Sequence, residues 1–341
     1  MSGKFSISVA PMMERTDRHF RYLMRLVSPS ARLYTEMITS AALLRGDAAS
    51  LLEFDATEHP VAAQLGGSDP DALAAAATLV AEAGYDEVNL NVGCPSSRVQ
   101  AGEFGARLML EPDRVAASVA AMVQSSGLPV TVKTRIGVDE HDDYEILKTL
   151  TTAVVAAGAS ALIVHARKAW LSGLSPKQNR EIPPLDYPRV YRLKAEFPAL
   201  PIEINGGFTT ERDVLAQMGK VDGVMLGRAA YNDPLLVGRL DRKLDRGADA
   251  GPPSATGLLE RYAVYMRREQ ARGTPLRAMT RHLMGLFREQ PGARRWRRRL
   301  GELTQSGASV DDLLAELTGM PTVTRYNAGS AGNPGTGIQE R

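Results

Sequence analysis

The first 230 residues of this 341-residue chain alternate short apolar stretches with longer amphipathic segments, and this alternation constrains the fold more than any other feature. Eight short runs have the apolar or alternating pattern of β-strands. They span residues 5–10, 31–36, 60–65, 86–91, 129–134, 160–165, 200–205 and 221–226. Eight strand-then-helix units of this length match a (β/α)₈ barrel, for which ~250 residues are typical.

Helix signals fill the gaps between these strands. Asp69 is a helix-capping residue type and Pro70 suits a first helical position, so the pair opens an alanine-rich helix. Gly158 is a typical helix-ending residue after another segment with helical spacing. The sequence predicts helices over residues 70–83, 112–126, 142–157 and 210–218.

A doubly wound open sheet is the main alternative to a barrel. That fold usually carries a Gly-x-Gly-x-x-Gly turn after its first strand, where the backbone approaches a nucleotide phosphate. Here the first strand runs into Ala10-Pro11-Met12-Met13-Glu14, which contains no glycine. The pattern therefore favours an α/β fold of the (β/α)₈ TIM-barrel type.

Polar residues and glycines gather at the carboxyl ends of the predicted strands. In strand order these are Pro11 with Met12, Glu36, Gln64, Asn91 with Cys94, Lys133 with Arg135, His165, Asn205-Gly206-Gly207, and Gly227 with Arg228. Each has an innocent explanation alone, since a glutamine can cap a loop and a histidine can be a satisfied core residue. In a barrel, however, all these ends meet at one mouth, so their shared position predicts a site there.

Cys94 is the only cysteine in the chain, and it follows the predicted strand that ends at Asn91. It can form neither a disulfide within the chain nor a Cys-x-x-Cys redox pair. A free thiol has a pKa of about 8.5 and is mostly protonated near neutral pH, so it suits proton donation better than thiolate attack. Taken alone, however, such a cysteine is more often a small buried apolar residue.

The residues at the predicted mouth have the composition of an FMN site. Glycines and an arginine after the last two strands suit a phosphate, and a lysine suits the pyrimidine edge of a flavin. The predicted cofactor-binding residues are Pro11, Met12, Met13, Gln64, Lys133, His165, Asn205, Gly206, Gly207, Gly227 and Arg228. Beside a reduced flavin, Cys94 would be the acid for reduction of a conjugated C=C bond. The five histidines lack metal-ligand spacing, and no Gly-x-Ser-x-Gly motif points to a hydrolase.

The C-terminal part carries an unusual excess of arginine. Residues 261–299 contain twelve arginines and two glutamates, whereas the whole chain has a net charge of only +2. This asymmetry predicts a polyanionic partner, although a solvated helical face is the simpler alternative. Helical spacing predicts a bundle with helices over 258–272, 277–289, 293–306 and 310–318.

The composition divides the chain into four parts. We expect a catalytic barrel domain over 1–245, a linker over 246–256, a helical domain over 257–325 and a disordered Gly-rich tail over 326–341. No stretch approaches the ~20 apolar residues needed to span a bilayer, and the N-terminus lacks the pattern of a signal peptide. We therefore expect a cytoplasmic protein without membrane contact.

Several motifs together resemble the tRNA-dihydrouridine synthase family. They are Ala10-Pro11-Met12, Thr35-Glu36-Met37, Gln64-Leu65-Gly66, Asn-Leu-Asn-Val-Gly-Cys-Pro-Ser at 89–96, Val132-Lys133-Thr134-Arg135, His165-Ala166-Arg167 and Asn205-Gly206-Gly207. The resemblance runs over residues 7–325. Segments 166–191, 280–282 (Thr-Arg-His) and 291–298 are similar to the A subfamily in particular. Glu14-Arg15 departs from the Asp and aromatic residue that the family more often has there.

This resemblance implies a flavin-dependent barrel with a helical tRNA-binding domain. NADPH would reduce tightly bound FMN, and FMNH⁻ would reduce the C5=C6 bond of uridines 20 and 20a in the tRNA D-loop. Hydride would pass from flavin N5 to C6 while Cys94 protonates C5. The residues implied for tRNA contact are Asn91, Lys177, Arg180, Arg294, Arg297 and Arg298. We expect a monomer that needs no metal.

Three alternatives remain open from the residues themselves. A barrel oxidoreductase could reduce a free pyrimidine or enone with FMN, but that leaves the arginines unexplained. A non-catalytic RNA-binding protein would bind no flavin. In a phosphate-binding barrel isomerase, Cys94 would be a packed thiol only.

Overall fold

The computed structural model describes residues 5–244, 254–305 and 307–316. Its strands form one closed barrel in which each strand pairs in parallel with the next and β8 pairs with β1. The strands are β1 Ser6–Val9, β2 Arg32–Thr39, β3 Val61–Gly66, β4 Glu87–Val92, β5 Val130–Arg135, β6 Ala161–His165, β7 Ile202–Asn205 and β8 Gly223–Leu226. All eight predicted strands and the (β/α)₈ fold are therefore confirmed, and the open sheet is excluded.

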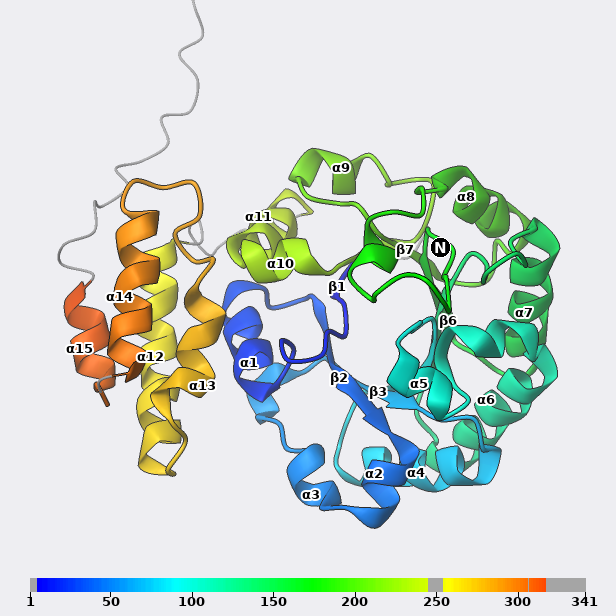
Figure 1. Ribbon diagram of the computed structural model, residues 1–341, viewed down its shortest axis with the longest axis horizontal. Helices are drawn as coiled ribbons and strands as arrows, with labels where there is room; N and C mark the ends of the chain where they lie inside the picture. Colours follow the sequence, from blue (N-terminus) through cyan, green and yellow to red (C-terminus); the bar gives the residue numbers. More distant parts are fainter. Residues whose placement is uncertain (1–4, 245–253, 306, 317–341) are drawn as a thin grey trace, which may run out of the picture.

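Helices form a ring around this barrel (Figure 1). They are α1 Arg18–Val27, α2 Ser40–Arg45, α3 Ala48–Leu51, α4 Pro70–Glu82, α5 Ser97–Ala101, α6 Pro112–Ser126, α7 Tyr144–Ala156, α8 Tyr187–Glu196, α9 Glu211–Leu215, α10 Arg228–Asn232 and α11 Leu235–Lys243. Short 3₁₀ turns lie at η1 Ala56–Glu58, η2 Gly105–Leu110 and η3 Gln178–Arg180.

The four helices predicted for the barrel are present, with small differences at their ends. The cap of α7 is Asp143, whose side chain accepts the Ile146 N–H, so this helix begins later than predicted. The cap of α9 is Thr210, but the helix ends at Leu215 instead of 218. The chain then folds back through an isolated bridge between Met218 and Val221, which leads directly into β8.

Inside the barrel, side chains pack in layers. An apolar layer fills the middle, and its members are Ala10, Tyr34, Ala62, Ile163 and Met225, with Met12 packed on it. Below it, Glu203 accepts hydrogen bonds from Ser6 and Ser8. A packed interior of this kind leaves the mouth as the place for chemistry.

The helical C-terminal region lies beside α1, α10 and α11 (Figure 1). It contains α12 Ala255–Ala271, α13 Leu276–Thr280, the 3₁₀ turn η4 Arg281–Leu283, α14 Ala293–Gln305 and α15 Val310–Ala315. The predicted helix over 277–289 is wrong beyond η4. The segment turns there to bring Gly285 against the barrel, where a Cβ would come within 2.3 Å of the Asn232 carbonyl oxygen.

Aromatic packing holds this region against α1. Tyr22 of α1 stacks on Tyr265 of α12 with ring centroids 3.9 Å apart. The Tyr262 hydroxyl donates to the His19 carbonyl at 3.1 Å, and Arg18 pairs with Glu269 at 2.5 Å. The two parts thus share a buried interface rather than a few surface contacts.

The predicted domain boundaries stay a prediction. Ser254 caps α12, which begins at Ala255 inside the predicted 246–256 linker. The rest of that linker and the predicted tail over 326–341 lie outside the described residues. Within the described ranges, no helix is both long and apolar enough to cross a membrane.

Candidate active site

The barrel brings the predicted residues of the middle strands together at its mouth. In register, Asn91 of β4 lies beside Lys133 of β5, and His165 of β6 lies beside Asn205 of β7. Lys133 Nζ donates to Asn205 Oδ1 at 3.2 Å. Asn205 Nδ2 in turn donates to the Met225 carbonyl oxygen at 2.8 Å. Side chains from β4 to β8 therefore form one continuous wall, as the sequence predicts.

A chain of hydrogen bonds runs from this wall down into the barrel. Asn91 Nδ2 donates to Gln64 Oε1 at 2.9 Å, and Gln64 Nε2 donates to Asn89 Oδ1 at 2.7 Å. Asn89 continues to Thr131 at 2.8 Å, and Thr131 donates to Glu87 at 2.6 Å. Because every member is buried and bonded, the network holds the Gln64 amide in one orientation.

Cys94 is positioned by the loop that follows β4. The Asn91 side-chain oxygen accepts the backbone N–H groups of Gly93 at 3.1 Å and Cys94 at 3.0 Å. The thiol sulfur lies 3.6 Å from the Ser96 hydroxyl. Cys94 is partly buried and packs against the hydrophobic core. Gly105 approaches this loop so closely that a Cβ would lie 2.4 Å from the Cys94 carbonyl oxygen.

Positive charge surrounds the thiol. Burial, aided by the charge of Arg135, lowers the pKa of Lys133 to about 7. Burial also lowers the pKa of Arg135 to about 10, while the Cys94 side chain acts in the opposite direction. Burial, together with the charges of Arg135 and Lys133, holds the pKa of His165 well below its usual range. His165 is therefore a neutral ring at this wall. Arg135 stays charged near neutral pH, whereas Lys133 is protonated only in part.

Arg135 has a structural role that its predicted position at a strand end did not reveal. Its Nε donates to the Gly93 carbonyl oxygen at 2.9 Å, next to the thiol. Its Nη1 donates to the carbonyl oxygens of Lys168 at 3.1 Å and Asn179 at 3.0 Å. The guanidinium thus ties the cysteine loop to the loop after β6. Arg135 is two residues from Lys133 and so lies on the same face of β5, and this spacing is the sequence pattern that indicates a position at the mouth.

The long loop between β6 and α8 carries two predicted tRNA-binding residues, Lys177 and Arg180, and both are exposed. Asn179, which the sequence pattern did not single out, is fully buried and exchanges hydrogen bonds with the Trp170 backbone at 2.7 and 2.8 Å. Gln100 connects this loop to the cysteine loop by donating to the Leu171 carbonyl oxygen at 2.6 Å. Burial and the charges of Arg228 and Arg15 lower the pKa of Arg180.

Two glycines after β7 adopt conformations that other residues rarely take. Gly206 and Gly207 have φ of 116° and 80°. A Cβ on Gly206 would lie 2.7 Å from the His165 ring, and one on Gly207 would lie 2.5 Å from Leu185. The Tyr187 hydroxyl donates to the Gly206 carbonyl oxygen at 2.7 Å and fixes the turn.

The end of β8 is more open. A Cβ on Gly227 would meet only Ala10 Cβ and Met12 Sδ, both at 3.9 Å. Met13 is 57% exposed, so the chain after β1 offers thioether surface at the rim. Arg228 is exposed and pairs with Glu181 at 2.5 Å. An anionic ligand would compete with that carboxylate for the guanidinium.

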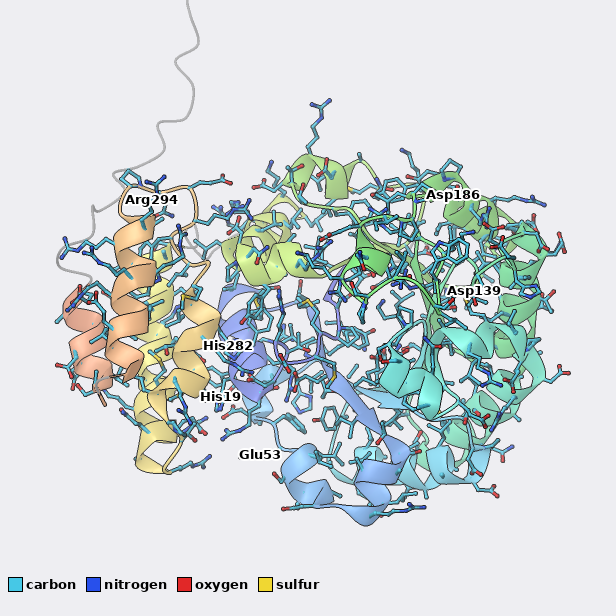
Figure 2. The ribbon with its side chains drawn as sticks, viewed as in Figure 1. His19, Glu53, Asp139, Asp186, His282 and Arg294 are labelled. Atoms are coloured by element: carbon cyan, nitrogen blue, oxygen red, sulfur yellow. The ribbon has the colours of Figure 1, made fainter. Side chains whose placement is uncertain are left out.

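The arginine-rich segment is only partly available to a polyanion. Many of its arginines pair with acids: Arg267 with Asp311, Arg268 with Asp55, Arg272 with Glu269, Arg281 with Asp17, and Arg299 with Glu302 and Glu316. Arg298 lies 3.6 Å from Glu302. Arg294 and Arg297 are exposed and have no acidic partner among the described residues. Figure 2 shows Arg294 at one end of α14.

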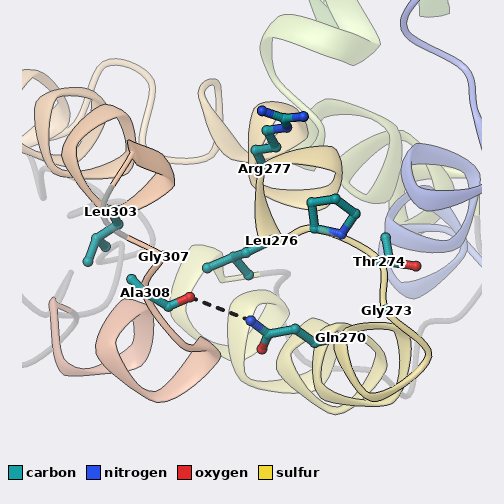
Figure 3. A pocket seen from close by; sticks show the side chains of 9 residues that line it. Gln270, Gly273, Thr274, Leu276, Arg277, Leu303, Gly307 and Ala308 are labelled. Carbon is teal, nitrogen blue, oxygen red and sulfur yellow. Dashed lines mark hydrogen bonds between the residues drawn. The ribbon is translucent and has the colours of Figure 1, made fainter.

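A cavity of about 470 Å³ lies in the helical region (Figure 3). It is lined by Gln270, Gly273, Thr274, Pro275, Leu276, Arg277, Leu303, Gly307 and Ala308. Arg277 is its one titratable lining residue, and no predicted site residue contributes to it. Across the described ranges, no cluster of three or more His, Cys, Asp or Glu could hold a metal ion. The mouth of the barrel therefore remains the candidate active site.

A closed (β/α)₈ barrel whose strand ends carry a partly exposed thiol, a half-buried lysine and a glycine-rich rim is typical of barrel enzymes, which bind their substrates at this mouth. The profile of the family described as Dihydrouridine synthase (Dus) matches residues 8–318 of the sequence. The chain belongs to this family of oxidoreductases, which confirms the resemblance of its motifs.

Curated relatives are similar over nearly the whole chain. A "tRNA-dihydrouridine(20/20a) synthase" of Xanthomonas axonopodis pv. citri is 54% identical over 301 residues, covering 88% of this chain and 89% of the relative. The protein of the same name from Shewanella oneidensis is 52% identical over 307 residues, covering 90% and 91%. That from Escherichia coli is 51% identical over 314 residues, covering 92% and 90%.

Proposed function

We propose that this protein uses FMN and NADPH to reduce uridines 20 and 20a of tRNA to 5,6-dihydrouridine. The relatives that share about half of their residues with it carry that specificity in their names. The observation on which the proposal depends most is the partly exposed Cys94 thiol, held beside a lysine and an arginine at the barrel mouth.

The residues at the mouth fit FMN. Gly227 has free space on the side that faces Met12. Lys133 is half-buried and donates to the Asn205 side-chain oxygen, and a bound anion would favour its protonated form. Gly206 and Gly207 have φ of 116° and 80°, and turns with such backbone conformations can present N–H groups to a phosphate. Arg228 would bind the phosphate, Gln64 and Lys133 the pyrimidine edge, and Pro11 to Met13 the ring face.

Reduced by NADPH, bound FMN would supply the hydride for C6 of the uracil. The protein would supply the proton, and we assign its donation to C5 to Cys94. The Asn91 side-chain oxygen accepts the backbone N–H groups of Gly93 and Cys94, which fixes the position of the Cys94 backbone. Arg135 anchors the same loop from the opposite side through the Gly93 carbonyl.

The tRNA would reach the mouth along the exposed cations. Lys177 and Arg180 lie on the loop after β6, and Arg294, Arg297 and Arg298 lie on α14. Phosphate contacts from these residues would position the strand without reading its sequence. The target uridine must leave its stack to reach the thiol, at a cost of a few kcal/mol that such contacts offset.

The test uses purified full-length protein, Cys94→Ala protein and tRNA transcribed without modifications. The wild-type protein should be yellow, oxidise NADPH, and form dihydrouridine at positions 20 and 20a by mass spectrometry of tRNA fragments. Cys94→Ala should keep its flavin and tRNA affinity but lose most product. Turnover of free uridine at a rate similar to tRNA would instead support a small-molecule reductase. Protein that stays colourless with added FMN would overturn the proposal.

A further inference from the structure

We propose that Arg281 and His282 of the helical region act as positioning residues for the β1–α1 loop, residues 10–17, and that they do so through Asp17. This inference rests on the proposed function, which places the loop against FMN. The Thr-Arg-His motif at 280–282 has no other role in the site, since neither Arg281 nor His282 lies among the residues of the mouth wall.

Asp17 joins the two parts of the molecule. Its carboxylate accepts the backbone N–H groups of His19 at 3.1 Å and Phe20 at 3.0 Å, and so caps α1. The same carboxylate binds Arg281 Nη2 at 2.6 Å and His282 Nε2 at 2.9 Å. One side chain therefore starts the first barrel helix and receives two donors from η4 of the helical region. Figure 2 shows His282 next to α1.

The histidine is fixed from all sides. Its side chain is completely buried. The centroid of its ring lies 5.5 Å from the ring centroid of Phe20 in α1 and 5.8 Å from that of Tyr231 in α10. The Tyr231 hydroxyl lies 3.3 Å from His282 Nδ1. A ring packed in this way presents Nε2 to Asp17 in one direction only.

From Asp17 the contacts continue back to the methionine that packs on the barrel interior. Thr16 is fully buried, and its hydroxyl accepts the Met12 N–H at 3.0 Å and donates to the Met12 carbonyl at 3.2 Å. The Arg15 N–H donates to Glu36 at 3.2 Å, and the Arg15 guanidinium lies over the Tyr231 ring. Each residue from 15 to 17 is thus attached to its surroundings, and the conformation at Met12 depends on them.

The charge of Arg281 also affects Glu36, which accepts the Arg15 N–H. Burial and the nearby Asp17 raise the pKa of Glu36, while backbone N–H groups and the charge of Arg281 lower it. Arg281 therefore opposes, in small part, the rise in the pKa of Glu36 that burial and Asp17 cause.

Between the described residues of the two parts, the other hydrogen bonds, ion pairs and ring contacts lie outside the loop. The Tyr22–Tyr265 stack and the Arg18–Glu269 pair hold α12 on α1 independently of η4. Arg268 also bridges the two parts, to Asp55 at 2.6 Å, but far along the chain from residues 10–17. Arg268 also lies near Glu269 and over the Tyr22 and Tyr265 rings. Arg268→Gln is consequently a control that disturbs the same interface without touching the loop.

The test compares full-length wild-type protein with Arg281→Gln, Arg281→Lys, His282→Gln and Arg268→Gln. Arg281 is exposed, so its variants should fold even if the buried His282 variant does not. Arg281→Gln should weaken FMN binding about tenfold by flavin fluorescence, as expected for loss of one charge-assisted hydrogen bond, and should alter the visible circular dichroism of bound flavin. Arg281→Lys should restore both in part, and Arg268→Gln should change neither.

Amide hydrogen exchange without FMN provides an independent readout. Residues 12–16 should exchange faster in Arg281→Gln than in wild-type or Arg268→Gln protein. Equal exchange and equal FMN affinity in Arg281→Gln and Arg268→Gln would overturn the inference. Wild-type protein that binds no FMN would overturn the proposed function instead, and the exchange comparison would still decide whether Arg281 orders the loop.

Discussion

Asn91 and Cys94 are joined by a hydrogen bond of 3.0 Å from the cysteine backbone N–H to the asparagine side-chain oxygen. The same oxygen accepts the Gly93 N–H, and the amide nitrogen donates to Gln64. The side-chain oxygen of Asn91 therefore serves to position the backbone that carries the thiol. A direct contact with RNA, expected from the resemblance, would have to use its remaining N–H and stays a prediction.

Two substitutions at Asn91 separate its acceptor from its donor. Asn91→Ala removes the acceptor for two backbone N–H groups, so the thiol loses its fixed position and product formation should fall 10- to 100-fold, or about 1.4–3 kcal/mol. Asn91→Asp keeps the acceptor for both N–H groups, although it loses the bond to Gln64 and adds a charge, so it should be less impaired than Asn91→Ala. Single-turnover formation of dihydrouridine by pre-reduced enzyme measures this, and equal loss in both variants would contradict the assignment.

Cys94 can be tested through the pH dependence of its replacement. Cys94→Ala should lose most activity near neutral pH because its side chain has no proton to give, whereas flavin reduction by NADPH should keep its wild-type rate. Cys94→Ser retains a hydroxyl of much higher pKa, so its residual rate should stay far below wild type at every pH from 6 to 9. A Cys94→Ala enzyme with full activity would exclude the proton-donor role.

Lys133 should control the reduction potential of bound FMN. A cation beside the pyrimidine edge stabilises the negatively charged reduced ring more than the neutral oxidised ring. Lys133→Met should therefore shift the two-electron midpoint potential to more negative values, by roughly 30 mV for every ~1.4 kcal/mol of lost interaction. Spectroelectrochemical titration measures the shift, with Lys177→Met on the exposed loop as the control. An unchanged potential would place Lys133 away from the ring.

Stability should depend on pH through His19, at the interface between α1 and α12. Burial, aided by the charge of Arg18 and opposed by that of Asp17, lowers the pKa of His19 to about 4. The unfolded chain, with an ordinary histidine pKa near ~6.5, therefore binds the proton first, so stability present above pH ~6.5 is lost as the pH falls towards 4. The contribution is on the order of 3 kcal/mol. Measured by urea unfolding, the free energy of unfolding of His19→Gln should depend less steeply on pH between ~4 and ~6.5 than that of the wild-type protein.

Asp17 adds a second loss of stability at lower pH. Burial alone would raise the pKa of Asp17, but the hydrogen bond and charge of His282, with the Phe20 N–H, lower it to about 2. A carboxylate whose folded pKa is depressed contributes stability above its unfolded pKa of ~3.9, and that stability disappears as the pH falls from 4 to 2. Asp17→Asn should be less stable than wild type at pH 6 and should approach it at pH 3.

The barrel could be predicted from the sequence because the patterns that indicate its strands are local. Each strand is a short apolar run, and the parallel topology then brings Gln64, Lys133 and His165 to one mouth. Pairings between distant residues carry no such signal. The sequence around Asp17 does not indicate that His282 binds it. The sequence around Asn179 likewise does not indicate that this residue holds the loop after β6 in place. The helix expected over 277–289 ended early because Gly285 packs against Asn232, a contact invisible in helical spacing.

The arginine-rich segment shows the same limit, and it leads to a sharper test of tRNA binding. By count its twelve arginines look equivalent, yet Arg299 is held by Glu302 and Glu316 whereas Arg294 and Arg297 have no acidic partner among the described residues. A phosphate can bind an arginine without a partner directly, but it must displace carboxylates from a paired one.

Arg294→Ala with Arg297→Ala should therefore weaken tRNA binding and reduce the slope of log affinity against log salt by about 0.7–0.9 for each phosphate that the variant no longer binds. Arg299→Ala, the matched paired arginine on the same helix, should leave that slope nearly unchanged. Filter binding of unmodified tRNA between 50 and 300 mM salt measures both slopes, and flavin reduction by NADPH should be the same in all three proteins. Equal slopes for the double variant and the wild-type protein would show that tRNA does not bind to Arg294 and Arg297 of α14.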